Sequence, residues 1–207
     1  SLVEKNAEFD LESYFPSVIE EFKAAGRDVL ITRKEKKVQT KVESAFLKDN
    51  TELYDLSFKT EKDIKIKIEV DTEPPLGCST EQKLSLMPFS FMTRCFTLPD
   101  LYAGKMHALI FRSYKNRVKG RDWYDFEWYV RHDVPLDLAH FQIRAKEFNG
   151  LDIDKAEFIK MLREKLGTTD INMVKQDVMP FVQNPAELDI WSNDYFLQLA
   201  DRIKYVE

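Results

Sequence analysis

The chain has 207 residues, of which 43% are hydrophobic and 32% are charged, and its formal net charge is −5. This composition supports one sizeable core, or a core with a smaller helical subdomain, and it excludes a protein that holds nucleic acid through a global positive field. No apolar run reaches the roughly 20 residues of a membrane helix, and Cys78 and Cys95 have no metal-ligand spacing, so we expect a cytoplasmic globular protein with two free thiols.

The N-terminal part of the sequence predicts a helix followed by extended segments. Apolar residues recur at helical spacing before Gly26, which predicts a helix over about residues 10–25. The turn at Asp49-Asn50 favours a meander of neighbouring strands. Runs rich in β-branched and aromatic residues place the strands near residues 29–31, 38–47, 53–58 and 64–70.

The later part of the sequence predicts helices. Residues 77–99 show no regular pattern, so we expect an irregular connection there. Helical periodicity follows at about residues 99–115, 122–131, 137–148, 154–166, 170–182 and 193–205. Strands first and helices later predict an α+β fold, with an α+β core over residues 1–98 and a C-terminal helical region over residues 99–207.

The last predicted strand ends in two carboxylates. Successive side chains of a strand point to opposite faces. The sequence I-K-I-K-I-E-V-D therefore places Ile64, Ile66, Ile68 and Val70 towards the core, and Lys65, Lys67, Glu69 and Asp71 on the opposite face.

Two further segments carry most of the chemical signal. The first runs from Leu98 to Arg112 (L-P-D-L-Y-A-G-K-M-H-A-L-I-F-R) and predicts a helix in which Lys105 and Arg112, seven residues apart, share a face. The second follows a basic loop and reads R-D-W-Y-D from Arg121 to Asp125.

These motifs, together with K-M-H-A-L and the alternating strand, resemble the AbiEii-type toxin nucleotidyltransferases of bacterial abortive-infection and toxin–antitoxin systems. That family belongs to the polymerase-beta-like nucleotidyltransferase superfamily, and the resemblance runs over about residues 1–130. It implies a partial nucleotidyltransferase-type sheet with flanking helices. It also implies transfer of a nucleotidyl group from an NTP to an acceptor hydroxyl, such as one on a tRNA, and a cognate antitoxin as partner.

The resemblance also implies roles for individual residues. Mg²⁺ is the expected metal, with Glu69 as the better candidate ligand and Asp71 as the second. The NTP is expected to contact Lys105, Arg112 and Arg121. The residues expected to act in catalysis are Glu69, Asp71, Lys105, Asp122 and Asp125.

Each of these residues also has a purely structural interpretation. Glu69 and Asp71 fit the solvated face of an amphipathic strand, and Lys105 fits a side chain that extends its ammonium group to solvent. Asp122 fits a helix N-cap with Asp125 in the first turn, and such a cap can also pair with Lys105 or Arg121.

The superfamily's Gly-Ser pair, followed about ten residues later by Asp-x-Asp, is not found in these 207 residues. The sole Asp-x-Asp, Asp152 to Asp154, lacks the Gly-Ser pair and precedes a helical pattern, so we interpret it as a cap. We interpret Ser1-Leu2 as the end of the missing metal-binding strand, and we therefore expect these 207 residues alone to be inactive.

Three further features bear on function. His107, His132 and His140 show no metal-ligand spacing. The basic loop of residues 113–121 fits either RNA contact or plain solvation. The alternative to an enzyme is a non-catalytic scaffold, or an RNA- or protein-interaction domain of the same fold, and the sequence leaves the oligomeric state open.

Overall fold

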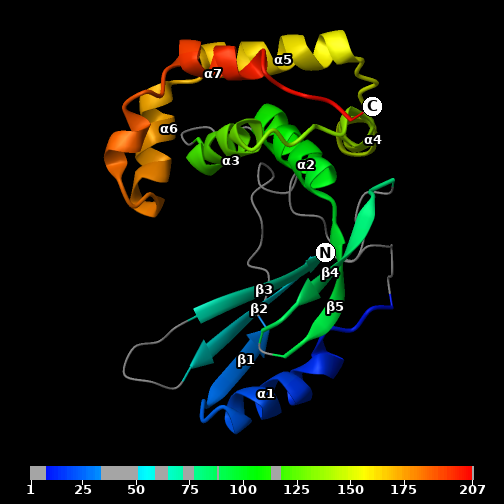
Figure 1. Cartoon of the computed structure of the whole chain (residues 1–207). Helices are drawn as coiled ribbons and strands as arrows, with labels where there is room; N and C mark the ends of the chain where they lie inside the picture. Colours follow the sequence, from blue (N-terminus) through cyan, green and yellow to red (C-terminus); the bar gives the residue numbers. More distant parts are fainter. Residues whose placement is uncertain are drawn as a thin grey trace. The chain divides into compact units, whose positions relative to one another are not determined.

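The computed structural model describes residues 8–33, 51–58, 65–71, 77–87, 89–112 and 118–206. The chain divides into two compact units, Ser1–Leu76 and Gly77–Glu207. Antiparallel strands and helices are both present, so the fold class is α+β, as the sequence predicts (Figure 1).

The first unit combines one helix with a three-stranded antiparallel sheet in the order β1-β2-β3. Thr51 lies opposite Asp71, and Leu53 lies opposite Glu69 in the β2–β3 register. Its elements are a short 3-10 turn at Glu12–Tyr14, α1 at Phe15–Ala24, β1 at Val29–Arg33, β2 at Thr51–Phe58 and β3 at Lys65–Asp71. The predicted helix and the strands near residues 29, 53 and 64 are confirmed, whereas the strand predicted at residues 38–47 lies outside the described residues.

The second unit begins with a β-hairpin in the segment that we expected to be irregular. Strands β4 (Thr80–Ser85) and β5 (Phe91–Phe96) pair antiparallel, with Thr80 opposite Phe96. The prediction was wrong because no side chain of either strand is fully buried. A hairpin without a buried face does not show the alternation of apolar and polar residues that reveals a strand in sequence.

Six helices follow: α2 at Leu98–Phe111, α3 at Gly120–Arg131, α4 at Leu138–Asn149, α5 at Lys155–Thr168, α6 at Ile171–Val178 and α7 at Asn193–Ala200. Short 3-10 turns at Met179–Phe181 and Pro185–Leu188 connect α6 to α7. The predicted helix over residues 170–182 therefore ends early, because Pro180 cannot donate the backbone hydrogen bond that would continue it. The last predicted helix ends at Ala200 rather than at residue 205.

Four of these helices begin at a side chain that accepts a backbone N–H, which is the usual way to satisfy the first turn. The capping residues are Asp137, Asp154, Asp170 and Ser192. Asp154 accepts from the backbone N–H of Glu157 at 2.8 Å, so the interpretation of the lone Asp-x-Asp as a cap is confirmed.

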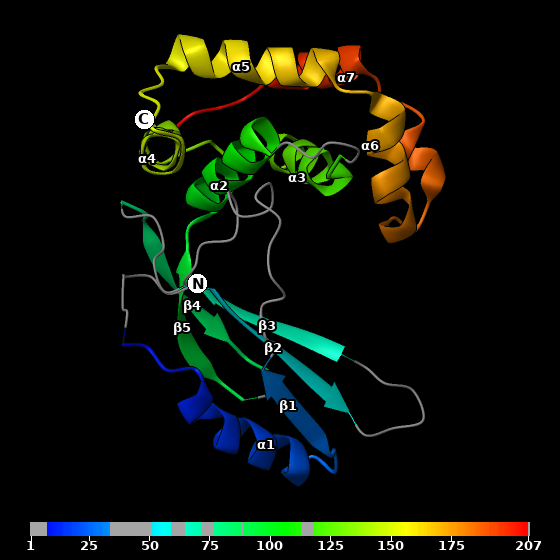
Figure 2. The same cartoon turned by 180° about the vertical axis from the view of Figure 1, so that it is seen from behind.

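The helices of the second unit pack in pairs around one core (Figures 1 and 2). Helix α2 packs against α3 and α4, α3 packs against α6, and α5 lies along α7. The largest fully buried side chains are Tyr102, Met106, Leu109, Phe126, Leu136, Phe141, Phe158, Leu162, Leu166 and Phe196. The buried carboxylate of Glu127 on α3 accepts hydrogen bonds from Trp191 Nε1 at 3.0 Å and from the Tyr195 hydroxyl at 2.5 Å.

Among the described helices, none combines the length and the apolar character that crossing a bilayer requires. Cys78 and Cys95 are free thiols, as predicted. His107 Nε2 lies 2.8 Å from Asn149 Oδ1, and His132 Nδ1 lies 2.8 Å from the Trp128 carbonyl oxygen.

His107 gives the α2–α4 contact a pH dependence. Burial lowers its pKa from 6.5 to about 4, although a 2.8 Å hydrogen bond to Asn149 opposes the shift. Because the unfolded chain takes up a proton in this range and the folded chain does not, stability should fall by about 3 kcal/mol as the pH drops from 6.5 to 4. Urea unfolding of His107→Gln should show a weaker loss over this window, with the surface variant His132→Gln as the control. An identical acid response in wild type and His107→Gln would contradict the assignment.

Candidate functional site

The candidate site is a pocket of about 380 Å³ in the second unit, between α2, α3 and the end of α6. Its lining residues are Lys105, Arg112, Arg121, Asp122, Tyr124, Asp125, Val178, Phe181 and Val182. Five of these nine residues were predicted from the sequence as site residues. The pocket therefore has a polar wall of three cations and two carboxylates, and an apolar wall that the sequence did not predict.

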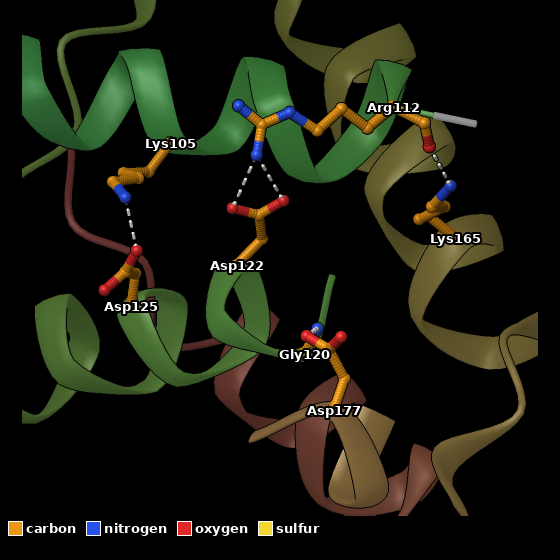
Figure 3. Close-up of polar contacts among 7 residues, drawn as sticks. All are labelled: Lys105, Arg112, Gly120, Asp122, Asp125, Lys165 and Asp177. Atoms are coloured by element: carbon orange, nitrogen blue, oxygen red, sulfur yellow. Dashed lines mark hydrogen bonds and ion pairs between the residues drawn. The ribbon is translucent and has the colours of Figure 1, made fainter. Parts of the chain in front are cut away.

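Lys105 reaches from α2 to α3, where its Nζ lies 2.5 Å from the Asp125 carboxylate (Figure 3). Both side chains are partly exposed, at 45% and 31% of their surface. Ion pairs that water reaches contribute little to folding, usually less than about 1 kcal/mol. The pair therefore fixes the direction of Lys105 while leaving its ammonium group accessible from the pocket.

Two helical turns further along α2, Arg112 faces Asp122 (Figure 3). Arg112 Nη1 donates to both carboxylate oxygens of Asp122, at 3.3 and 3.1 Å. The Asp122 side chain is only 4% exposed. Burial raises the pKa of this carboxyl above its ordinary value, and the positive charges of Arg112 and Lys105 act in the opposite direction.

The prediction that Asp122 is a helix N-cap is wrong. Helix α3 begins at Gly120, so Asp122 lies inside its first turn, and the residue at the cap position, Lys119, makes no side-chain capping bond. Instead the backbone N–H of Gly120 donates to Asp177 Oδ2 on α6 at 2.9 Å. Since a neighbouring helix supplies this acceptor, the carboxylate of Asp122 is directed at Arg112 instead.

Gly120 also sets how closely α3 approaches α6. A Cβ atom at this position would lie 2.2 Å from the carbonyl oxygen of Val174 and 3.1 Å from the backbone nitrogen of Val178. Both are backbone atoms of α6, so no side chain can move aside to make room. Val178 lines the pocket. The glycine is therefore required by the helix contact that brings Val178 to the pocket.

Helix α5 holds the C-terminal end of α2. Lys165 Nζ donates to the backbone carbonyl of Arg112 at 2.9 Å (Figure 3). Arg112 has extended backbone angles and follows directly on the last residue of α2. A cation here complements the partial negative charge of the helix C-terminus. Burial lowers the pKa of Lys165, and the negative charge of Asp122 opposes that shift.

Arg121 is the third cation of the pocket. Its guanidinium carbon lies 5.8 Å from the centre of the Phe181 ring, and it has no ion-pair partner among the described residues. Phe181 is 69% exposed. A cation over an aromatic face is attracted by the ring's negative charge density. This cation–π contact stabilises the positions of Arg121 and Phe181 at the rim of the pocket.

The two remaining predicted site residues, Glu69 and Asp71, lie at the end of β3 in the first unit. Their side chains lie outside the described part of the structure. Within the described residues, no group of three or more His, Cys, Asp or Glu side chains is arranged to hold a metal ion. Asp122 and Asp125, the two carboxylates that line the pocket, are each paired with a cation.

Sequence reasoning missed the groups that build the pocket from α5 and α6. Phe181, Lys165 and Asp177 gave no motif, because their partners on α2 and α3 lie 53 residues away or more in the sequence. One signal was present: an apolar V-M-P-F-V run ends α6 at a proline, which places an aromatic side chain outside the helix.

A family model described as "Nucleotidyl transferase AbiEii toxin, Type IV TA system" matches residues 3–199. The matched range covers almost the whole chain and includes every residue of the pocket. No curated protein sequence matches the chain significantly.

Gly120→Ala should destabilise the protein by about 2 kcal/mol, because the added methyl group displaces the backbone of α6. Gly167→Ala is the matched control: that glycine lies in α5, and a Cβ atom added there would meet nothing within 4 Å. Alanine at this position should therefore be neutral or stabilise by up to about 1 kcal/mol. Chemical denaturation of both variants measures the difference. Equal effects of the two substitutions would contradict the close approach of α3 to α6.

Asp122→Asn should gain stability relative to wild type as the pH rises. Burial raises the pKa of Asp122 in the folded protein above its ordinary value of 3.8. Between these two pKa values the folded wild type keeps the proton of Asp122, whereas the unfolded chain has lost it. The wild type therefore loses stability as the pH rises from 3.8 to the folded-state pKa. The asparagine does not titrate. The difference in melting temperature between the Asp122→Asn variant and wild type should therefore increase from pH 4 upward and then level off. A difference that shrinks with rising pH would show that Arg112 outweighs burial.

Proposed function

We propose a role for each residue of the pocket from one premise: the chain belongs to the AbiEii nucleotidyl transferase toxin family. The family comprises toxins of type IV toxin–antitoxin systems, so a nucleotide substrate and an antitoxin partner follow from membership. The function that the pocket supports best is binding of the NTP whose nucleotidyl group is transferred.

The observation that carries this proposal is the placement of Lys105 and Arg112. Lys105 lies on α2 and Arg112 directly follows its last residue, and both line a pocket of about 380 Å³ that Arg121 also lines. Small-molecule pockets are usually about 300 to 1,000 Å³. Three cations converge there against two carboxylates, which leaves an excess of one positive charge for the phosphates of a nucleotide.

In nucleotidyl transfer, the acceptor hydroxyl oxygen forms a bond to the α-phosphorus, and the bond from that phosphorus to the pyrophosphate oxygen breaks. The hydroxyl proton passes to water, and negative charge accumulates on the departing pyrophosphate. A fixed cation at that position stabilises the transition state more than the ground state. We assign this role to Lys105, with Asp125 orienting its ammonium group and Asp122 holding Arg112 beside it.

Nucleotidyltransferases generally use a divalent metal together with the NTP. We propose Mg²⁺ for this protein, with Glu69 and Asp71 as two of its ligands. The proposal rests on the position of these two carboxylates at the end of the alternating strand in the sequence. We also propose that the 207 residues bind the nucleotide without transferring it, because the Gly-Ser and Asp-x-Asp signature is not among them.

We propose RNA, such as a tRNA end, as the acceptor. The argument is the basic composition of residues 113–121, which lead into α3 and end at Arg121 on the rim of the pocket. Lysine and arginine side chains bind nucleic acid mainly through phosphate contacts, without requiring a positive net charge of the whole protein.

In a form of the protein that carries the Gly-Ser and Asp-x-Asp signature, Lys105→Ala should lower transfer of label from radioactive NTPs to total RNA by at least about 100-fold, because a preorganised charge at the leaving group is lost. Its melting temperature should change little, since the Lys105–Asp125 pair is partly exposed. Lys160→Ala is the matched control: it removes a lysine from α5 that pairs across the helix surface with Glu157 and does not line the pocket.

Two results would change the proposal. If Lys105→Ala keeps full activity while the parent protein transfers label, the reaction stands and the role of Lys105 does not. If the parent protein transfers no label from any of the four NTPs to RNA, protein or small-molecule hydroxyls, the non-catalytic scaffold replaces the enzyme.

A further inference from the structure

We infer that the apolar wall of the pocket is a nucleobase subsite, in which the base of the bound NTP stacks on Phe181 beside the Arg121 guanidinium. This inference rests on the proposed function, because it takes the polar wall to hold the phosphates. It adds residues from the end of α6 that no sequence motif identified, and it assigns them to a different part of the substrate.

Phe181 is exposed although it lines the pocket. Its side chain is 69% exposed, whereas Val178, the last residue of α6 and three positions earlier, is almost fully buried. Exposing a phenyl ring to water is unfavourable, and aromatic rings left exposed inside a pocket are typical of ligand sites. Among the described residues Phe181 makes no ring–ring contact, so a ring face remains for a ligand.

The backbone after α6 directs the Phe181 ring towards the pocket. Helix α6 ends at Val178, and Met179–Phe181 form a single 3-10 turn with Pro180 in its first positions. Proline fixes its own φ angle and cannot continue the helix. The turn therefore directs Phe181 away from the core and towards the pocket. The next residue, Val182, also lines the pocket.

A positive charge lies beside the Phe181 ring. Arg121 lies over the Phe181 ring at 5.8 Å and pairs with no carboxylate among the described residues. A guanidinium group is flat, stays charged and stacks on aromatic faces, so it can lie against a base while its N–H groups reach a phosphate. Arg121 therefore stands at the junction of the polar and the apolar wall.

The division of the pocket matches the division of a nucleotide. The charged lining residues come from α2, from the residue that follows it and from α3, whereas Val178, Phe181 and Val182, the apolar wall, come from the end of α6 and the turn that follows it. A nucleotide likewise joins anionic phosphates to a flat aromatic base. Stacking on one ring tolerates every base, because each base has a π-face. Phe181 therefore contributes affinity rather than base identity.

The test separates the base from the phosphates by using two probes, ATP and inorganic tripolyphosphate, in titration calorimetry with the 207-residue chain. Phe181→Leu removes the ring while keeping an apolar side chain, and should weaken ATP binding by about 5- to 100-fold. It should leave tripolyphosphate binding within about twofold, since tripolyphosphate has no base. Phe181→Tyr keeps the ring and should restore ATP binding.

Phe148→Leu is the matched control. Phe148 also lies under an arginine, with the Arg144 guanidinium 5.3 Å from its ring centre, but it does not line the pocket, so this variant should bind both probes as wild type does. Lys105→Gln should weaken binding of both ATP and tripolyphosphate, because Lys105 is proposed to contact the phosphates that the two probes share.

Three results would overturn the inference. ATP binding unchanged in Phe181→Leu would remove the stacking role while the proposed function stands, provided that Lys105→Gln still weakens binding. Equal loss of ATP and tripolyphosphate in Phe181→Leu would show that the ring acts on the pocket as a whole. Failure of the wild type to bind either probe would remove the proposed function and the subsite together.

Discussion

Asp122 places a carboxylate where water barely reaches it, at the contact between α2 and α3, and the guanidinium of Arg112 supplies the opposing charge. Leaving a buried carboxylate without a partner is strongly unfavourable, so the pair requires α3 to begin beside the end of α2. That requirement sets the geometry of the pocket. With α3 fixed in this way, Asp125 lies one turn further along and meets Lys105, and Arg121 reaches the rim.

Helices α5 and α6 fix the positions of α2 and α3 through hydrogen bonds to their backbone. Lys165 bonds to the backbone at the end of α2, and Asp177 bonds to the first backbone N–H of α3. The absence of a side chain at Gly120 lets α6 approach α3 closely enough for Val178 to line the pocket. The charged side chains of the pocket therefore come from two helices, while neighbouring helices fix their positions, and all of them belong to the second unit.

The helices of the second unit could be predicted from the sequence because α3, α6 and α7 have clear apolar periodicity and four of the six helices have a capping residue, such as Asp154. Lys105 and Arg112 could be predicted as neighbours because seven residues are two helical turns. The partners of these two cations could not, because they depend on the first residue of α3. The sequence pattern predicted that α3 begins at Asp122, which suggested an N-cap. The helix begins at Gly120 instead, and Asp122 is the buried ion-pair partner of Arg112. The β4–β5 hairpin and Phe181 were missed because exposed residues carry no periodic signal.

The two ion pairs of the pocket differ in the solvent exposure of their carboxylates. Lys105 and Asp125 are both partly exposed, so an incoming phosphate can replace the carboxylate at small cost to folding. Arg112 faces a carboxylate that is 4% exposed, and removing the guanidinium from it would leave a buried charge without a partner. A phosphate therefore gains Lys105 as a ligand far more readily than it gains Arg112. We therefore propose that Asp125 orients Lys105 until the nucleotide binds and that Lys105 then exchanges this carboxylate for a phosphate, whereas Arg112 remains bound to Asp122 and acts through the field it adds.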